Sequence, residues 1–231
     1  MTPTDEIDAV DAVRGGADII DVKNPAEGSL GAALPSLIRR IRTAVPNEVP
    51  VSAALGDIPF LPGTVAQAAL GAAMAGADYV KIGLHGIKTH EQALLVMKSV
   101  KTTILDFKPT VQVVAAAYGD YKRVGTLNPS ALPEIAAAAE IDVMMVDTAV
   151  KDGQSLFEFM SENKVRELID NSRSSGLKAA LAGSLVGDTY KRAVNLKPDI
   201  VGVRGAAITD GDRTSGRVDS KLVAELKQMI G

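Results

Sequence analysis

The sequence predicts an α/β fold in which a parallel sheet closes into a TIM (β/α)8-type barrel. Three observations predict it. The chain has 231 residues, a length at which a single barrel is common. Short aliphatic runs without polar alternation are typical of strands that are buried on both faces. These runs alternate with amphipathic helical patterns, which indicates βαβ units with right-handed crossovers.

Seven candidate strands follow one another along the chain, each rich in Val, Ile, Leu or Ala. No linker, charge block or low-complexity tract separates them, so we expect one domain that spans residues 1–231. A doubly wound open sheet is the rival fold, but no Gly-x-Gly-x-x-Gly turn follows a first strand. The strands are expected at Ala17–Val22, Pro50–Leu55, Tyr79–Leu84, Val111–Ala117, Asp142–Val146, Lys178–Leu181 and Ile200–Val203.

Helical patterns fill the intervening segments. The first runs through Ile7, Val10 and Val13 and stops at Gly15-Gly16. The alanine-rich piece Ile135–Ala139 fits a helix packed against a sheet. The last helix begins after Asp219 as N-cap, and its apolar face carries Leu222, Val223, Leu226, Met229 and Ile230.

The first strand of the barrel is short or missing at the N-terminus. Thr2-Pro3 resembles a helix start, and Asp5 with Glu6 supplies the negative charge that a first helical turn favours. That leaves no room for a strand before the first helix. Either the recorded start is short or the barrel stays open at one seam. We expect the former, because natural sheets avoid unpaired edges.

Composition excludes several classes of protein. The net charge is −3, hydrophobic residues make up 46% and charged residues 23%, as in an ordinary globular protein. The mild acidity and 3% aromatic content argue against a nucleic-acid partner. No apolar run is long enough for a membrane span. With no cysteine and no signal-peptide pattern, we expect a cytoplasmic protein; a homo-oligomer is compatible with the sequence.

Charged residues occur at strand ends where a plain core would place Val or Ile. In Ala17–Val22 and its continuation, Asp21 and Lys23 share one face with Ile19, because side chains alternate along a strand. We therefore expect both at the barrel mouth, where such folds place their catalytic groups. The alternative is an ion pair that closes the barrel rim.

A second lysine has the same position on another strand. Lys81 shares its face with Tyr79 and Gly83, so it also points inward. Two ammonium groups close together lower each other's pKa, and a neutral amine can attack a carbonyl or accept a proton. The alternative is that each lysine pairs with an aspartate.

The strand Asp142–Val146 leads into Asp147, which the same alternation directs inward. Lys151 follows on the loop as a phosphate ligand, a proton-transfer group or a solvated cation. Asp57 has the same place after Pro50–Leu55 as Asp21 and Asp147 have after their strands, but its carboxylate can also serve only to cap a turn.

Small residues follow the last two strands, where barrels commonly bind phosphate. Gly183 and Ser184 in one loop and Gly205 in the other allow backbone N–H groups to approach an oxyanion, and Arg204 adds a bidentate donor. The segment Gly211-Asp212-Arg213 beyond them fits a flexible polar flap or a plain surface loop.

Nothing in the sequence indicates a metal or another cofactor. His85 and His90 are five positions apart, so they do not share a helix face, and no cluster of carboxylates accompanies them. His90 fits a helix start beside Thr89. Neither a Ser-His-Asp arrangement nor a phosphate-binding loop of the Walker type is present.

The strand-end motifs resemble those of the (5-formylfuran-3-yl)methyl phosphate synthases, also called 4-(hydroxymethyl)-2-furancarboxaldehyde-phosphate synthases, of methanofuran biosynthesis. The resemblance runs from Ile7 to the last helix. It departs at the N-terminus, where the family has a first strand and this chain has Met1-Thr2-Pro3. The motifs that carry it are Asp21-Val22-Lys23-Asn24-Pro25, Glu27-Gly28-Ser29-Leu30-Gly31, Gly76–Gly83, Asp147–Gly153, Ala180–Ser184 and Asp199–Ala207.

The resemblance implies a barrel lyase that joins two glyceraldehyde 3-phosphate molecules, with loss of phosphate and water. It also implies that Lys23 is the Schiff-base lysine and Lys81 the proton acceptor. From strand-end parity we add that Asp21 and Asp147 orient the lysines and relay protons, and that Lys151 neutralises a phosphate. Two phosphorylated substrates need two anion sites, the second formed by the Asn24–Gly31 loop with Lys151.

Two other functions remain open at this point. One is an ordinary Schiff-base (class I) aldolase of another sugar phosphate, and the other is a non-catalytic barrel that binds a phosphorylated metabolite. A purely structural protein leaves the two inward lysines unexplained.

Overall fold

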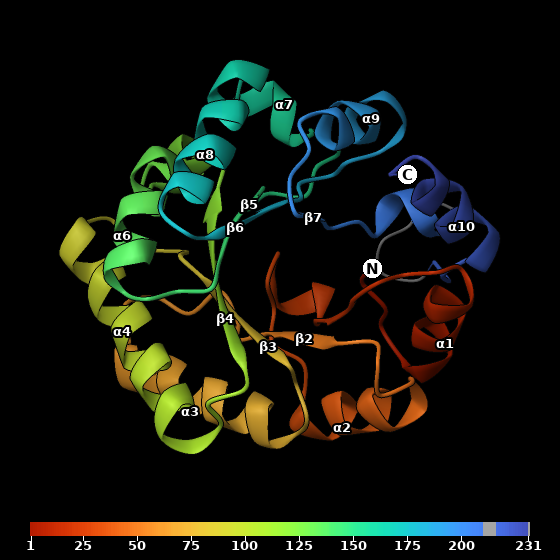
Figure 1. Cartoon of the computed structure of the whole chain (residues 1–231), viewed down its shortest axis with the longest axis horizontal. Helices are drawn as coiled ribbons and strands as arrows, with labels where there is room; N and C mark the ends of the chain where they lie inside the picture. The colour runs from red at the N-terminus through yellow and green to blue at the C-terminus, as the bar shows by residue number, and fades with distance from the viewer. Residues whose placement is uncertain (210–215, 231) are drawn as a thin grey trace.

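The computed structural model describes residues 1–209 and 216–230 of the chain. The polar flap expected at Gly211-Asp212-Arg213 lies outside them. One parallel sheet curls into an incomplete barrel, with helices in a ring around it (Figure 1). The sheet order follows the chain order, as the alternation of elements predicts. The strands are β1 Ile20–Val22, β2 Val51–Ala54, β3 Tyr79–Gly83, β4 Gln112–Tyr118, β5 Val143–Asp147, β6 Lys178–Leu181 and β7 Ile200–Val201.

Helices follow the strands along the chain and include the three segments that the sequence singles out as helical. None in the described part of the chain is long and apolar enough to cross a membrane. Short 3-10 turns occur at Pro25–Glu27 (η1), Pro129–Ala131 (η2) and Gly205–Ala207 (η3). The α-helices are α1 Glu6–Arg14, α2 Pro35–Ala44, α3 Pro62–Met74, α4 His90–Phe107, α5 Tyr121–Val124, α6 Leu132–Ala138, α7 Leu156–Phe159, α8 Glu162–Ser174, α9 Gly187–Asn195 and α10 Ser220–Gln228.

Capping residues explain where several helices begin. Asp219 caps α10 by accepting the N–H of Lys221, and Thr89 caps α4 in the same way, as the sequence predicts. The expected start of α1 at Thr2-Pro3 is wrong. The helix begins at Glu6, because Asp5 is the residue whose side chain accepts a first-turn N–H group. Residues 1–4 are therefore available for other contacts.

Those first residues lie in the seam between β7 and β1, which do not pair with each other. The backbone of Met1 accepts a hydrogen bond from the N–H of Asp21 (2.8 Å), and its ammonium donates to the carbonyl of Ile19 (2.7 Å). On the other side, Thr2 donates to the carbonyl of Val203 (3.1 Å). Two residues thus bridge the position at which a closed barrel has one more strand.

Strand alternation separates two apolar cores. The larger core lies between the sheet and the helices and includes Ile20, Val80 and Val146. The smaller one lies inside the barrel and includes Val114 and Met145. Because the two faces have opposite parity along each strand, residues at inward positions reach the barrel mouth when they stand at a strand's carboxyl end.

Aspartates that immediately precede three of the strands fix the sheet register at the opposite end of the barrel. Asp78, Asp142 and Asp199 each accept the N–H of the first or second residue of the neighbouring strand, from Val51, Val113 and Ala179, at 2.7–2.8 Å. Each carboxylate satisfies a donor that lies beyond the end of the ladder. The same aspartate-to-backbone contact therefore recurs at three pairs of neighbouring strands.

Candidate active site

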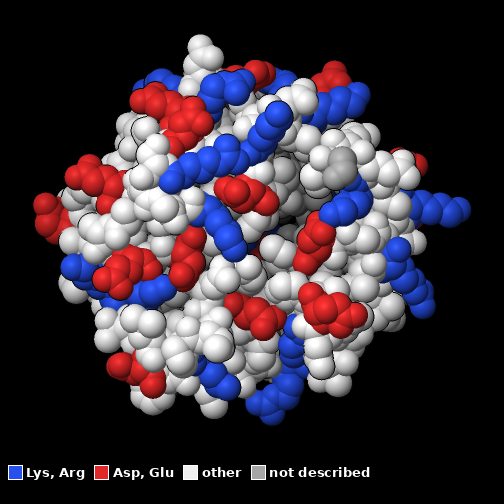
Figure 2. Space-filling model, viewed as in Figure 1, with Lys and Arg blue, Asp and Glu red and all other residues white. Residues whose placement is uncertain are grey.

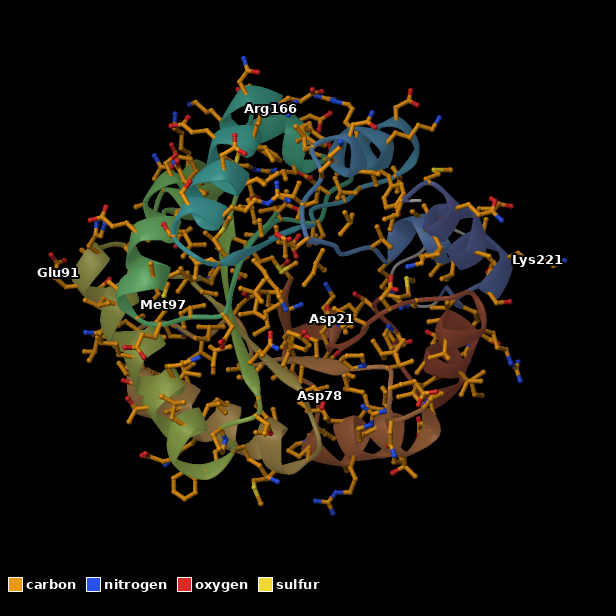
Figure 3. All side chains as sticks on the ribbon, in the orientation of Figure 1. Asp21, Asp78, Glu91, Met97, Arg166 and Lys221 are labelled. Carbon is orange, nitrogen blue, oxygen red and sulfur yellow. The ribbon has the colours of Figure 1, made fainter. Side chains whose placement is uncertain are left out.

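A cavity of about 260 Å³ opens at the carboxyl ends of the strands, on the side of the barrel that contains β1 and β5–β7. Figure 3 shows Asp21 near the centre of the ring, whereas Glu91, Arg166 and Lys221 lie at its rim. Charged side chains of both signs are interspersed over the molecular face in Figure 2. The polar residues that line the cavity include Asp21, Lys23, Lys81, Asp147, Lys151, Ser184 and Arg204.

Lys81 and Asp21 form an ion pair inside the barrel. The ammonium of Lys81 donates to both carboxylate oxygens of Asp21, at 2.7 and 2.8 Å, and Ser52 donates to the same carboxylate (2.9 Å). Burial by itself raises the pKa of Asp21, but the cations of Lys81 and Lys23 hold it well below its usual range. The alternative that each lysine pairs with an aspartate therefore holds for Lys81.

Lys23 has a different environment. Its side chain is buried, and within the described residues its amine has neither a hydrogen bond nor an ion pair. Burial lowers the pKa of Lys23 to about 7; the Asp147 carboxylate opposes this, whereas the cations of Lys81 and Lys151 add to it. A large share of Lys23 is thus neutral near pH 7, as a nucleophilic amine requires.

Asp147 and Lys151 form a second ion pair, and both charges act on Lys23. The Lys151 ammonium donates to Asp147 and to the hydroxyl of Thr148 (3.1 Å). Burial opposes the charge on Asp147, yet the cations of Lys151 and Lys23 keep its pKa below the usual value. Lys151 is therefore held inside the cavity and is not a solvated loop cation.

The turn after β6 has an unusual backbone. Gly183 has φ 113° and Ser184 has φ 50°, so two consecutive residues adopt left-handed conformations. A side chain on Gly183 meets Thr148 and Leu156 at 3.1–3.2 Å, which favours glycine there. Among the described residues, no acceptor takes the N–H of Ser184 or Gly205. Both residues line the cavity, where an oxyanion can accept from such groups.

Arg204 also lines the cavity, but its guanidinium has structural partners. It donates to the carbonyls of Thr2 (2.8 Å) and Gly216 (3.1 Å), and it lies 3.6 Å from the buried carboxylate of Asp8. These contacts fix the loop that carries Gly205. The structure thus places Arg204 as a support for this end of the cavity.

Sequence reasoning missed Asp120, a buried residue after β4. Its carboxylate accepts the N–H groups of Ala149 (2.7 Å) and Val150 (3.0 Å), and so it holds the loop that carries Lys151. The signal that marks it is its position three residues beyond the expected strand Val111–Ala117, close to the position that Asp57 has beyond Pro50–Leu55.

Within residues 1–209 and 216–230, no three His, Cys, Asp or Glu side chains converge as metal ligands do.

Comparison with known proteins identifies the family. Residues 1–227 match the family model described as 4-HFC-P synthase. A (5-formylfuran-3-yl)methyl phosphate synthase of Methanopyrus kandleri is 52% identical over 230 residues, which cover 100% of this chain and 97% of that protein. The protein of the same name from Methanocaldococcus jannaschii is 49% identical, with 99% and 97% covered.

Solved structures confirm the fold class. A phosphoribosyl anthranilate isomerase from Thermus thermophilus superposes with a TM-score of 0.62 at 18% identity, covering 99% of this chain and 94% of that one. A dihydrodipicolinate synthase superposes with a TM-score of 0.65 at 17% identity, covering 97% and 68%. At these identities the likeness concerns the fold alone.

Proposed function

Because this chain belongs to the 4-HFC-P synthase family, we propose that it makes (5-formylfuran-3-yl)methyl phosphate from two molecules of glyceraldehyde 3-phosphate through an imine on Lys23. The family's place in methanofuran biosynthesis then applies to this chain. The activity is that of a lyase, with phosphate and water as the other products.

The unpaired amine of Lys23, held between two ion pairs, is the observation that carries the proposal. Its pKa of about 7 supplies neutral amine at physiological pH. Attack on the substrate aldehyde forms a C–N bond, and the carbonyl oxygen leaves as water. The resulting iminium draws electrons from the neighbouring carbon, which makes that carbon's proton acidic.

The Asp21–Lys81 pair balances the protons of these steps. Lys81 gives a proton to the departing oxygen and becomes neutral, and it then takes the proton from the carbon next to the iminium. Asp21, whose two carboxylate oxygens both accept from the Lys81 ammonium, keeps that amine in place. Loss of the carbon proton leaves an enamine, whose electron pair either expels the phosphate or forms the carbon–carbon bond to the second aldehyde.

Asp147 and Lys151 form the second ion pair near Lys23. Asp147 relays protons and orients the amine, while Lys151 neutralises a phosphate group. Gly183, Ser184 and Gly205 form the first anion site through their backbone N–H groups, and Arg204 holds it together. The Asn24–Gly31 loop with Lys151 forms the second. A homo-oligomeric state and a cytoplasmic location stay predictions from the sequence.

Borohydride reduction in the presence of glyceraldehyde 3-phosphate tests the proposal. We expect mass spectrometry of the digested protein to find a reduced adduct on the peptide that contains Lys23. The Lys23→Ala variant gives no adduct and no turnover, while Lys178→Ala, a change on an exposed lysine, leaves both unchanged. An adduct on another lysine, with activity retained in Lys23→Ala, contradicts the assignment.

Product analysis separates this function from the aldolase alternative. Furan formation gives an ultraviolet absorption that a simple aldol product lacks. A phosphometabolite-binding barrel without catalysis gives neither a furan nor a reducible imine.

A further inference from the structure

The loop after β1 is hydrogen-bonded to the segments that follow β2 and β5. Its neck closes where Asn24 donates to the carbonyl of Gly31 (2.9 Å), directly after Lys23. Ser29 donates to the carbonyl of Thr148 beyond β5 (2.8 Å), and Leu30 lies fully buried in the inner core. We name residues 24–31 the latch loop. Any shift of its neck moves Lys23, the preceding residue.

Asp57, beyond β2, holds the latch loop at its far end. One of its carboxylate oxygens accepts the N–H of Leu30 (3.1 Å), and the other accepts the hydroxyl of Tyr118 at the end of β4. The adjacent Gly56 donates to the carbonyl of Leu30 (3.0 Å). Asp57 therefore does more than cap a turn, because it joins β2, β4 and the latch loop.

The hydrogen bond between Tyr118 and Asp57 is tightly packed against the backbone of Gly83. A side chain on Gly83, at the end of β3, meets the Tyr118 hydroxyl at 2.7 Å, Asp57 at 2.9 Å and Leu30 at 3.1 Å. Burial raises the pKa of Tyr118 well above its usual value, and the Asp57 carboxylate adds to this, so the hydroxyl keeps its proton and remains a donor. His85 lies edge-on to the Tyr118 ring.

We propose that Asp57 is a positioning residue, whose carboxylate fixes the latch loop and thereby keeps the Lys23 amine buried between Lys81 and Asp147. Asp57 does not line the cavity, so it acts through Leu30 and the loop neck. The inference rests on the proposed role of Lys23.

The pKa of Lys23 makes the effect of Asp57 on the latch loop measurable. The groups that act on this amine are Asp147, Lys81, Lys151 and Asp21, together with the ammonium of Met1. Burial is the largest cause of its low pKa, and Asp57 is not among the main charges. A loosened latch loop admits water to Lys23, so the pKa rises toward that of a free lysine and less amine is neutral at pH 7.

Three variants test the inference by the pH dependence of borohydride trapping at Lys23. Asp57→Ala removes both acceptors, whereas Asp57→Asn retains an acceptor for Leu30 and a partner for Tyr118. The matched control is Asp142→Ala, which also deprives a backbone N–H and one further side chain, here Lys101, of a carboxylate, but at the opposite end of the barrel. Hydrogen exchange of the Leu30 and Gly31 amides and thermal unfolding are measured on each variant.

We expect Asp57→Ala to trap about fivefold more slowly at pH 7, with the rising limb moved about one unit to higher pH. Exchange at Leu30 and Gly31 becomes faster. Asp57→Asn restores trapping to within about threefold of the parent. Asp142→Ala loses stability but keeps the midpoint of the limb.

An unchanged limb in Asp57→Ala, or the same limb in Asp57→Ala and Asp142→Ala, overturns the inference. Failure of the proposed function is distinguishable, because the parent protein then gives no adduct on Lys23. In that case the exchange rates of Leu30 and Gly31 still decide whether Asp57 holds the latch loop.

Discussion

At the scale of single residues, burial and the Asp147 carboxylate have opposite effects on the pKa of Lys23, and one substitution separates them. Asp147 raises the pKa of Lys23, against the larger lowering by burial. In Asp147→Asn the pKa of Lys23 falls below about 7, so the rising limb of borohydride trapping moves to lower pH. More imine forms at pH 6 than in the parent protein.

Turnover in Asp147→Asn is expected to fall, whereas imine formation at pH 6 rises. If Asp147 relays protons, we expect furan formation to fall at least about tenfold although the imine still forms. Steady-state assays between pH 5 and 9 measure this, with Asp170→Asn on the exposed face of α8 as the control. Turnover within a few-fold of the parent rules out the relay role, whatever the trapping limb does.

At the scale of strands, the aspartates that precede β3, β5 and β7 are expected to stabilise the sheet. Asp78→Ala leaves the N–H of Val51 and the guanidinium of Arg42 without this acceptor. We expect the free energy of unfolding to fall by about 1–3 kcal/mol. Urea unfolding measures the loss, and Asp106→Ala, at an exposed position on α4, costs about 0.5 kcal/mol or less. Equal losses in the two variants contradict the role.

The strand pattern also explains which parts of the site were predictable. A period of two along each strand places Asp21, Lys23, Lys81 and Asp147 on the inner face without any knowledge of the neighbouring strands, and all four line one cavity. Their pairing was not predictable, because the choice of Asp21 as the partner of Lys81 joins residues 60 positions apart in the sequence. That choice depends on how the barrel curves.

Contacts between loops depend even more on tertiary structure. Tyr118 meets Asp57 from 61 positions away, and Ser29 meets Thr148 from 119. No local pattern signals either. Arg204 shows the same dependence: its chemistry suits a phosphate, and its contacts with Asp8 and two backbone carbonyls could not be foreseen from the sequence.

At the scale of the whole molecule, Asp8 joins the two ends of the chain across the seam. It lies fully buried on α1 and accepts from Val218 (3.1 Å) and from Thr4 (2.9 Å). Its carboxylate also pairs with Arg204 and Arg217. Because β1 and β7 share no ladder, these contacts carry much of the closure of the barrel.

Asp8→Ala is therefore expected to be among the most damaging substitutions outside the cavity. It removes the carboxylate partner from a buried ion pair with Arg204, which costs about 3–5 kcal/mol of unfolding free energy. Chemical denaturation measures the loss. The control is Asp188→Ala, whose exposed pair with Lys191 at 3.5 Å contributes about 0–1 kcal/mol. If Asp8→Ala unfolds at the same denaturant concentration as Asp188→Ala, the hydrogen bonds of Met1 and Thr2 alone close the seam, and the Asp8–Arg204 pair is dispensable.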